Sequence, residues 1–348
     1  MPVRRLTLPA APLSFDGATG AAEARARRRT TISELELGPL RFGIVGAGRL
    51  GCTIGRALQQ QGFEVVHATS ASPAGRERAA HALGVPVHED PLAACEQVDC
   101  ALLCVRDDAL PSVVRRLAER PATASPMRLR FVSTSAWGGR TVLAPLAALG
   151  HATAVLHPMA TVADHSVDVA ALSGAGAAIG AGDDAESTLA GALAHTLGLH
   201  PFPLEEAAWP LHAAACTLAS NGPAALLAAA ADLAATIGVH DGVARSAYAR
   251  LAAAAVDRAA RMGAVESMAG PILRGDAAAV ATQVAAVRHS STEVDALFIP
   301  VVASVANRAF TTGRIDMAAH RSLLEAVLDP TQFVDGEFTH GDGEEGQA

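Results

Sequence analysis

A glycine-rich segment near the start of the chain has the spacing of a nucleotide-binding loop. Gly46, Gly48 and Gly51 form a GxGxxG pattern at the end of an apolar run. The first glycine permits a tight turn, the second lets the backbone approach a pyrophosphate, and the third lets a helix pack closely on a strand. The segment therefore predicts dinucleotide binding. The residues expected to make the contacts are Gly46, Ala47, Gly48, Arg49, Leu50 and Gly51.

The surroundings of this loop match what the pattern requires. An apolar strand is expected at Arg41–Val45, an amphipathic helix at Leu50–Gln61, and a second strand from Glu64. The start of such a helix offers unpaired N–H groups and the positive end of a dipole to phosphate. A purely structural strand–helix turn is the alternative, and the context disfavours it.

The end of the second strand indicates which dinucleotide binds. An NAD site needs Asp or Glu there to bind the ribose 2′-hydroxyl, whereas this chain has Ala68–Ser72 followed by two arginines. Hydroxyl and guanidinium groups suit a 2′-phosphate, so NADP is predicted as the cofactor. The alternative is that both arginines only solvate the next helix. The residues assigned to the 2′-phosphate are Ser70, Ser72, Arg76 and Arg78.

Polar residues also follow other predicted strands, at the edge of the sheet where ligands bind in α/β proteins. Val105 ends one strand and is expected to border the cofactor. Ser133 and Ser135 follow the next strand, and we expect them either to meet the nicotinamide end or to form an ordinary turn. Asp107 or Asp108 is expected to cap the intervening helix.

Two histidines are candidates for contact with a substrate. His157 ends a strand and precedes a proline, so it is either held at the rim of the sheet or is a structural histidine. His212 and Cys216 lie four residues apart on one face of a predicted helix. Asn221 falls near the opposite side of that helix, and Pro223 predicts a kink or an end there.

The apolar segments predict an α/β domain followed by an all-helical domain. Up to about Leu199, short apolar runs alternate with helical stretches, as in a doubly wound parallel sheet. The later part is rich in Ala and Leu and is predicted to be helical, with Asp276 capping a helix at Ala277–Val287. The strands are expected at Arg41–Val45, Glu64–Ala68, Cys100–Val105, Arg130–Thr134, Thr153–His157 and Ala177–Gly180. The predicted divisions are a flexible extension at 1–38, a nucleotide-binding domain at 39–200, a helical domain at 201–330 and a disordered acidic tail at 331–348.

Composition excludes several classes of protein. A net charge of −8 argues against nucleic-acid binding. No apolar run is expected to span a membrane, which takes roughly 18 residues, and the start of the chain lacks a secretion signal. The 5 cysteines form no CxxC pair, so no metal site is predicted and a reducing cytoplasm is indicated. All 27 basic residues are arginine, which excludes a lysine general acid or Schiff base.

Four segments together resemble a group of oxidoreductases that carry a Rossmann-like N-terminal domain and a C-terminal domain of unknown function 2520. They are the glycine loop, Leu156–Thr161, His212–Asn221 and Gly270–Asp276, and the resemblance covers about residues 41–330. It implies an all-α C-terminal domain of the 6-phosphogluconate dehydrogenase type and a homodimer formed through it. It also implies relationship to ketopantoate reductases, 3-hydroxyacid dehydrogenases and pyrroline-5-carboxylate reductases. Pro223 departs from the usual helix of the group.

The resemblance implies hydride transfer from NADPH to a small keto acid, with ketopantoate as a candidate. Related enzymes use a lysine as the proton donor, and this chain has none, so His212 first and His157 second are the expected acids. Asn221 is a further candidate catalytic residue, and Asn221 and Arg274 are expected to bind the substrate, although Arg274 is equally suited to the surface. Two alternatives remain open at this stage: an imine reductase, and a regulatory protein that binds NADPH without turnover.

Overall fold

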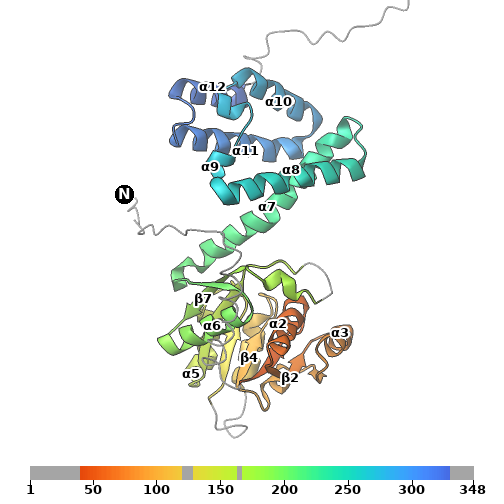
Figure 1. Cartoon of the computed structure of the whole chain (residues 1–348), viewed down its shortest axis with the longest axis vertical. Coiled ribbons are helices and arrows are strands. Elements are labelled where there is room, and N and C mark those ends of the chain that lie inside the picture. Colours follow the sequence, from red (N-terminus) through yellow and green to blue (C-terminus); the bar gives the residue numbers. More distant parts are fainter. Residues whose placement is uncertain (1–39, 120–127, 163–166, 330–348) are drawn as a thin grey trace, which may run out of the picture. The chain divides into compact units, whose positions relative to one another are not determined.

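The computed structural model describes residues 40–119, 128–162 and 167–329, which form two compact units (Figure 1). The first unit ends at Cys216 and the second begins at Thr217. This division lies beyond the boundary expected after residue 200, because helix α7 (Trp209–Thr236) begins inside the first unit. The predicted extension at 1–38 and the predicted tail at 331–348 lie outside the described residues.

The first unit is built on an eight-stranded sheet with the order β3-β2-β1-β4-β5-β6-β7-β8. Neighbouring strands pair in parallel, except that β7 runs antiparallel to β6. The strands are β1 (Arg41–Val45), β2 (Glu64–Thr69), β3 (Val87–His88), β4 (Cys100–Leu103), β5 (Arg130–Ser133), β6 (Ala152–Pro158), β7 (Gly176–Ala181) and β8 (His200–Pro203).

Six of these strands match the strands expected from the sequence. The prediction that all strands are parallel was wrong for one pair, β6 and β7. A parallel connection needs a crossover, usually an α-helix. The described part of the connection between β6 and β7 contains only a 3-10 turn, Val169–Leu172, and the chain reverses direction there. The two unexpected strands lie at the sheet edges: β3 has two residues, and β8 contains Pro201 and Pro203, which are tolerated at an edge.

Helices cover both faces of the sheet and confirm the doubly wound α/β fold. One buried cluster contains Ile54 and Leu58 of α2 and Leu193 of α6. A second contains Val114 of α4 and Leu146 of α5. The helices are α2 (Arg49–Gln60), α3 (Pro73–Leu83), α4 (Leu110–Ala118), α5 (Ala144–Ala148) and α6 (Asp184–Thr196).

Trp209, the first residue of α7, anchors that helix to the first unit. Its side chain is 1% exposed and belongs to the buried cluster that includes Phe131 and Leu146. The ring lies in a notch beside Gly139 and Gly180, where any side chain would collide with it: a Cβ on Gly180 would lie 2.9 Å from Trp209 Cζ2. The start of α7 is therefore fixed by the fit of one large ring against two glycines.

Glu186, a buried carboxylate on α6, holds the beginning of β6. Its Oε1 accepts a hydrogen bond from Thr153 N at 2.8 Å, and its Oε2 accepts one from Gly182 N at 2.7 Å. Arg140 Nη2 lies 3.8 Å from the same carboxylate. These contacts place β6 in the sheet, and the last residues of that strand are His157 and Pro158.

The second unit is helical, as the sequence predicts. Its buried cluster joins α10, α11 and α12 through residues such as Val284, Val302 and Leu323. Asp276 caps α10, because its side chain accepts a hydrogen bond from Ala279 N at 3.0 Å. The elements of this unit are the later part of α7, α8 (Asp241–Met262), α9 (Ala264–Ser267), α10 (Ala277–Ser290), α11 (Thr292–Thr311) and α12 (Met317–Leu328).

Helix α7 continues through Pro223 instead of ending there. A proline inside a helix removes one backbone hydrogen bond, and the two flanking segments remain helical despite that loss. Of the two outcomes expected at this proline, a kink or an end of the helix, the end does not occur.

Two described helical stretches are long and apolar enough to cross a bilayer by length and composition alone: Glu206–Thr236 and Glu293–Thr311. The expectation that no apolar run approaches this length was wrong for these two stretches: the first is rich in Ala and Leu, and the second in Val, Ala and Phe. Core helices of soluble proteins pass the same test, and Glu293–Thr311 supplies Val302 and Ala306 to the core of the second unit.

Candidate active site

The glycine loop joins β1 to α2 in the conformation that the GxGxxG pattern predicts. Gly46 has a φ of 91°, and a Cβ there would lie 2.6 Å from Val105 Cγ1. A Cβ on Gly51 would collide with the carbonyl oxygen of Gly46. The fold itself therefore requires glycine at both of these positions.

Gly48 differs from its two neighbours in the motif. It has a φ of −77°, and a Cβ built on it meets no atom within 4 Å. The described part of the protein therefore does not itself require a glycine here. Gly48 is the N-cap of the 12-residue helix α2, and the first turn of that helix holds no acidic residue. An open approach to a positive helix end is what a phosphate group needs.

The residues assigned to a 2′-phosphate gather after β2, and several already make contacts. Ser72 caps α3 by accepting a hydrogen bond from Gly75 N at 3.1 Å. Arg76 Nη1 donates to the carbonyl oxygens of Ser70 and Ala71 and lies 3.2 Å from Glu89 Oε2.

Arg78 lies exposed on α3, near α2. Its charge acts on the Cys52 thiol, although burial outweighs that effect and raises the pKa of Cys52. Helix α3, which follows β2, thus presents two guanidinium groups, and Glu89 already neutralises part of the charge of Arg76.

A cavity of about 460 Å³ opens beside the glycine loop, within the first unit. It brings together the beginning of α2 and the carboxyl ends of β4, β5 and β6. Its volume lies in the range of small-molecule sites. Among the predicted site residues, the cavity is lined by Gly48, Arg49, Leu50, Val105, Ser135 and His157.

The serines after β5 take part in an internal hydrogen-bond network. Ser135 Oγ donates to Asp107 Oδ1 at 2.5 Å and accepts from Trp137 N at 2.9 Å. Ser133 Oγ accepts from Ser135 N at 3.2 Å, and Ser133 is buried rather than part of the cavity lining. Of the two roles considered for these serines, turn formation accounts for these contacts, while Ser135 also borders the cavity.

The two candidate histidines meet although 55 residues separate them in the chain. His157 Nδ1 lies 3.0 Å from His212 Nε2, and Cys216 Sγ lies 3.7 Å from the same nitrogen. Trp209 and Phe202 pack edge-on against the His212 ring, with ring centroids 5.7 and 5.9 Å away. His157 lines the cavity, so the pair lies beside it.

Burial determines the protonation of this group. Burial, with a smaller contribution from the neighbouring His212, lowers the pKa of His157 to about 4. Burial also lowers the pKa of His212 and raises the pKa of the Cys216 thiol. Both imidazoles are therefore neutral at neutral pH, and one ring donates an N–H to the other. This differs from the unperturbed histidine assumed in the sequence-based assignment of the proton donor.

Asn221 and Arg274 belong to the second unit, where both are exposed. Arg274 ends a 3-10 turn just before the N-cap Asp276. Their proposed contacts with substrate remain predictions.

Family profiles match the two halves of the sequence. Residues 26–158 match a Rossmann-like domain, and residues 176–303 match a family described as a domain of unknown function, DUF2520. The chain joins a Rossmann-like domain to a DUF2520 domain. The second match begins at β7, so the DUF2520 region includes the end of the sheet as well as the first helices of the second unit. No curated protein matches the sequence significantly.

Solved structures share this combination of a Rossmann-like and a helical part. A Bacteroides fragilis protein provisionally described as an NADP oxidoreductase is 17% identical, with a TM-score of 0.62 over 77% of this chain and 98% of its own. A Thermotoga maritima protein is 15% identical, with a TM-score of 0.60 over 79% and 100%. A pyrroline-5-carboxylate reductase from Coxiella burnetii is 15% identical, with a TM-score of 0.51 over 86% and 100%. At these identities the similarity establishes the fold.

Several lining residues of the Rossmann-like domain were not assigned a role from the sequence. Cys104 and Thr134 line the cavity because β4 and β5 end just before them, one or two residues earlier than expected, and Ala160 follows the end of β6. Asp107 also lines it and accepts from Ser135 instead of capping α4. Cys216 was recognised only by its spacing from His212, and no sequence signal indicates that His157 joins them.

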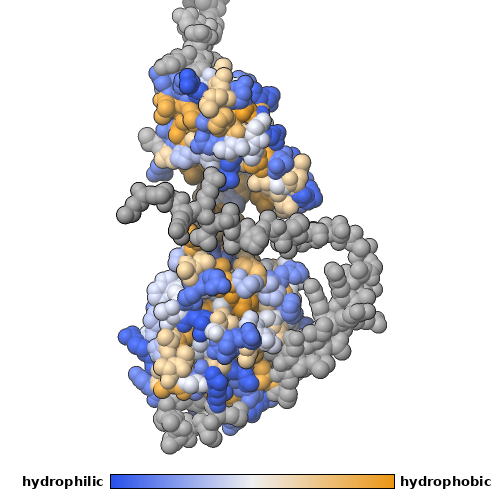
Figure 2. Space-filling view, turned by 90° about the vertical axis from the view of Figure 1, so that its left-hand side faces the viewer, coloured by the Kyte–Doolittle hydropathy of each residue, from blue (hydrophilic) through white to orange (hydrophobic). Residues whose placement is uncertain are grey.

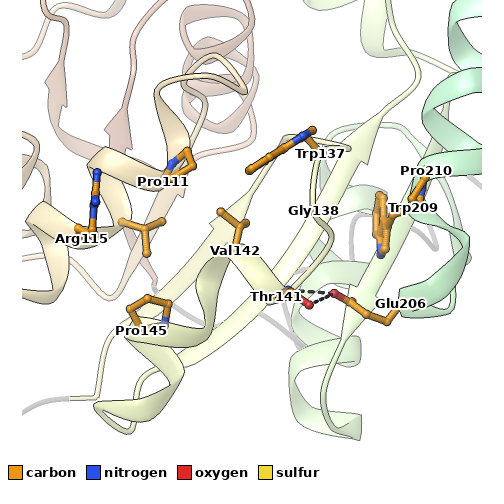
Figure 3. A pocket seen from close by; sticks show the side chains of 11 residues that line it. Pro111, Arg115, Trp137, Gly138, Thr141, Val142, Pro145, Glu206, Trp209 and Pro210 are labelled. Carbon is orange, nitrogen blue, oxygen red and sulfur yellow. Dashed lines mark hydrogen bonds between the residues drawn. The ribbon is translucent and has the colours of Figure 1, made fainter.

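A larger cavity, of about 650 Å³, lies elsewhere on the first unit (Figure 3). Trp137, Val142 and Trp209 contribute to its mainly apolar lining, and Glu206 accepts a hydrogen bond from Thr141 N at 2.9 Å at its edge. None of the glycine-loop residues and neither candidate histidine lines it. The smaller cavity is therefore the candidate active site.

Proposed function

We propose that the protein is an NADPH-dependent oxidoreductase that transfers hydride to the carbon of a C=O or C=N group. One observation carries the proposal: a single cavity is lined both by Gly48 at the start of α2 and by His157 of the histidine pair. In this proposal the glycine loop binds the pyrophosphate, and the cavity holds the nicotinamide and a small substrate. Structurally similar proteins include one described as an NADP oxidoreductase and a pyrroline-5-carboxylate reductase, which supports this class of reaction.

The chemistry requires an electrophile or hydrogen-bond donor at the atom that gains electron density. As hydride reaches a carbonyl carbon, negative charge develops on the oxygen, and a positioned donor stabilises it. We assign this function to His212 and His157, which lie beside the cavity as neutral imidazoles. A neutral imidazole N–H can polarise a carbonyl without carrying a charge. Asn221 and Arg274 are proposed to orient the substrate.

The substrate is proposed to be a small keto acid, with ketopantoate as the first compound to test. A cyclic imine is the second candidate, because a pyrroline-5-carboxylate reductase shares the fold over 86% of this chain. An iminium carbon is already activated toward hydride, so an imine reductase needs less help from side chains. A cytoplasmic location is part of the proposal and is supported by cysteines that lie mainly in apolar segments.

The decisive experiment is a calorimetric titration of the purified protein with NADPH and with NADH, followed by turnover assays. The assays follow loss of NADPH absorbance with ketopantoate, other 2-keto acids and pyrroline-5-carboxylate. NADPH binding with turnover of one compound is the expected result. Tight binding without any turnover would favour a regulatory protein, and no binding would overturn the proposal.

Replacing Arg76 and Arg78 together with alanine is expected to weaken NADPH binding about tenfold, roughly 1.4 kcal/mol, while NADH binding changes little. The physical reason is loss of the guanidinium groups proposed to meet the 2′-phosphate, which NADH lacks. Titration of both nucleotides measures the effect. Arg76 also binds the carbonyl oxygens of Ser70 and Ala71. An equal loss for both nucleotides would therefore mean that the arginines only shape the loop.

A homodimer formed through the helical unit is also part of the proposal. Apolar side chains are exposed along its helices, among them Leu218 of α7 at 75% and Leu251 of α8 at 66%. Apolar surface also interrupts the polar surface of the unit in Figure 2. Surfaces of this kind mark interaction sites.

Light scattering is expected to give about twice the chain mass of 35.3 kDa. Changing Leu218 and Leu251 to glutamate should then yield monomers, because charged groups would enter the apolar contact. Ser246→Glu, an exposed change elsewhere on α8, is the matched control and should remain dimeric. A monomeric parent protein would contradict the assignment.

A further inference from the structure

Three potential metal ligands converge at the end of the first unit. They are His157 Nδ1, His212 Nε2 and Cys216 Sγ, and all three atoms lie within 4.8 Å of one another. The two nitrogens are 3.0 Å apart, and the sulfur lies 3.7 Å from His212 Nε2. Each distance alone is that of a hydrogen bond. His212 Nε2, however, carries either one N–H or one lone pair, so it cannot make both contacts as full hydrogen bonds at the same time.

These separations are close to those within a tetrahedral zinc site. Zinc binds histidine nitrogen at about 2.0–2.1 Å and cysteine sulfur at about 2.3 Å. Tetrahedral angles then place two nitrogens about 3.3 Å apart, and a nitrogen and a sulfur about 3.6 Å apart. The observed 3.0 and 3.7 Å need shifts of only a few tenths of an ångström. The third pair, His157 Nδ1 and Cys216 Sγ, lies within 4.8 Å, and rotation of the cysteine side chain would bring it to the same N–S separation.

The elements that carry the three ligands are held firmly. His212 and Cys216 lie at positions i and i+4 of α7, the same spacing that places two histidines on one helix face in zinc proteases. Trp209 fixes the start of α7, and Glu186 fixes β6, which carries His157. The ligands are thus positioned by the sheet and by an anchored helix end.

We propose that His157, His212 and Cys216 bind one Zn²⁺ ion. Two imidazoles and one thiolate suit zinc, whereas Mg²⁺ and Ca²⁺ require oxygen ligands. Three protein ligands leave a fourth position for water or substrate, which is the arrangement of catalytic zinc sites. On binding, the Cys216 thiol releases its proton to solvent and the sulfur forms the metal bond.

The proposed zinc site also contributes to hydride transfer, and this part of the inference rests on the proposed function. His157 lines the cavity assigned to the nicotinamide and substrate. A zinc ion held by these side chains would supply the electrophile for the oxygen of a carbonyl substrate. With the metal bound, His157 and His212 would act as its ligands, and zinc would replace an imidazole N–H in polarising that oxygen. The chain has no lysine to do so. Zinc binding itself does not depend on that assignment.

The first test uses the full chain without an affinity tag, treated with a chelator and then dialysed. Titration with Zn²⁺ against a competing chromophoric chelator is expected to give one ion per chain, and mass spectrometry of metals should agree. Co²⁺ then serves as a spectroscopic probe. It should produce a thiolate-to-metal charge-transfer band and the intense visible bands of tetrahedral cobalt.

Ligand variants make the test specific. Cys216→Ser should abolish the charge-transfer band and weaken zinc binding by at least about 100-fold, since even changes outside the ligand shell cost roughly 10–100-fold. His157→Gln and His212→Gln should weaken it similarly. His81→Gln and Cys95→Ala, which alter a histidine on α3 and a cysteine outside the group, should bind zinc as the parent does. Circular dichroism establishes that each variant is folded.

Three results would overturn the inference: no zinc retained by the folded parent, zinc binding that survives Cys216→Ser unchanged, or binding of copper alone. All titrations are carried out without nucleotide, so they do not depend on the reductase proposal. Gly48→Val should keep zinc. Loss of zinc with intact NADPH binding would remove only the metal site, and loss of NADPH binding with zinc retained would remove only the proposed function.

Discussion

Gly48→Val is expected to abolish measurable NADPH binding while the protein folds as before. A Cβ at this position meets no atom within 4 Å, so the fold has room for the new side chain. The same space is where a pyrophosphate must approach the start of α2. We expect an increase in Kd of at least about 100-fold, or roughly 2.7 kcal/mol, in a calorimetric titration with NADPH.

Two glycine variants serve as controls for this result. Gly191→Val, at a position on α6 that also has no atom within 4 Å, should bind NADPH normally. Gly51→Ala should instead lower the stability to unfolding, because its Cβ collides with the carbonyl oxygen of Gly46. Unchanged NADPH affinity in folded Gly48→Val would remove the dinucleotide assignment of the loop.

His212→Ala is expected to lower kcat by about 100-fold or more while changing the Kd for NADPH less than threefold, once a substrate has been found. General acid–base or electrophilic groups contribute roughly 100- to 10,000-fold to a rate. His212 lies 3.0 Å from His157, which lines the cavity, whereas the glycine loop does not depend on either ring. Steady-state kinetics and NADPH titration separate the two effects.

His81→Ala is the matched control, since it removes an exposed histidine from α3. It should leave both kcat and the Kd for NADPH unchanged. If kcat of His212→Ala equals that of the parent, the donor or electrophile must be sought among the other groups of the cavity, with Asp107 the first to examine.

The residues that sequence analysis placed well are those whose roles depend on local pattern. The glycine spacing, the strand before it and the helix after it specify the loop, and the structure has β1, α2 and β2 within about one residue of their expected bounds. Residues after strand ends were expected at the rim of the sheet, and Val105, Ser135 and His157 line the cavity there.

Features that depend on tertiary contacts could not be obtained in this way. The reversal of β7 follows from a connection without an α-helix in its described part, and the apolar pattern of that strand is the same for either direction. The meeting of His157 with His212 and Cys216 depends on how α7 docks on the sheet. The sequence also left open whether α7 kinks or ends at Pro223, and the helix continues past it.

Gly139 and Gly180 form the notch that receives the Trp209 ring, and through it they affect the position of His212. His212 lies one turn beyond Trp209, so the position of its ring is determined by the depth to which that indole sinks between Gly139 and Gly180. A homologue could keep both histidines and the cysteine and still hold them apart, if either glycine were replaced by a larger residue. The absence of a side chain at Gly139 and Gly180 therefore determines how far His212 and Cys216 lie from His157.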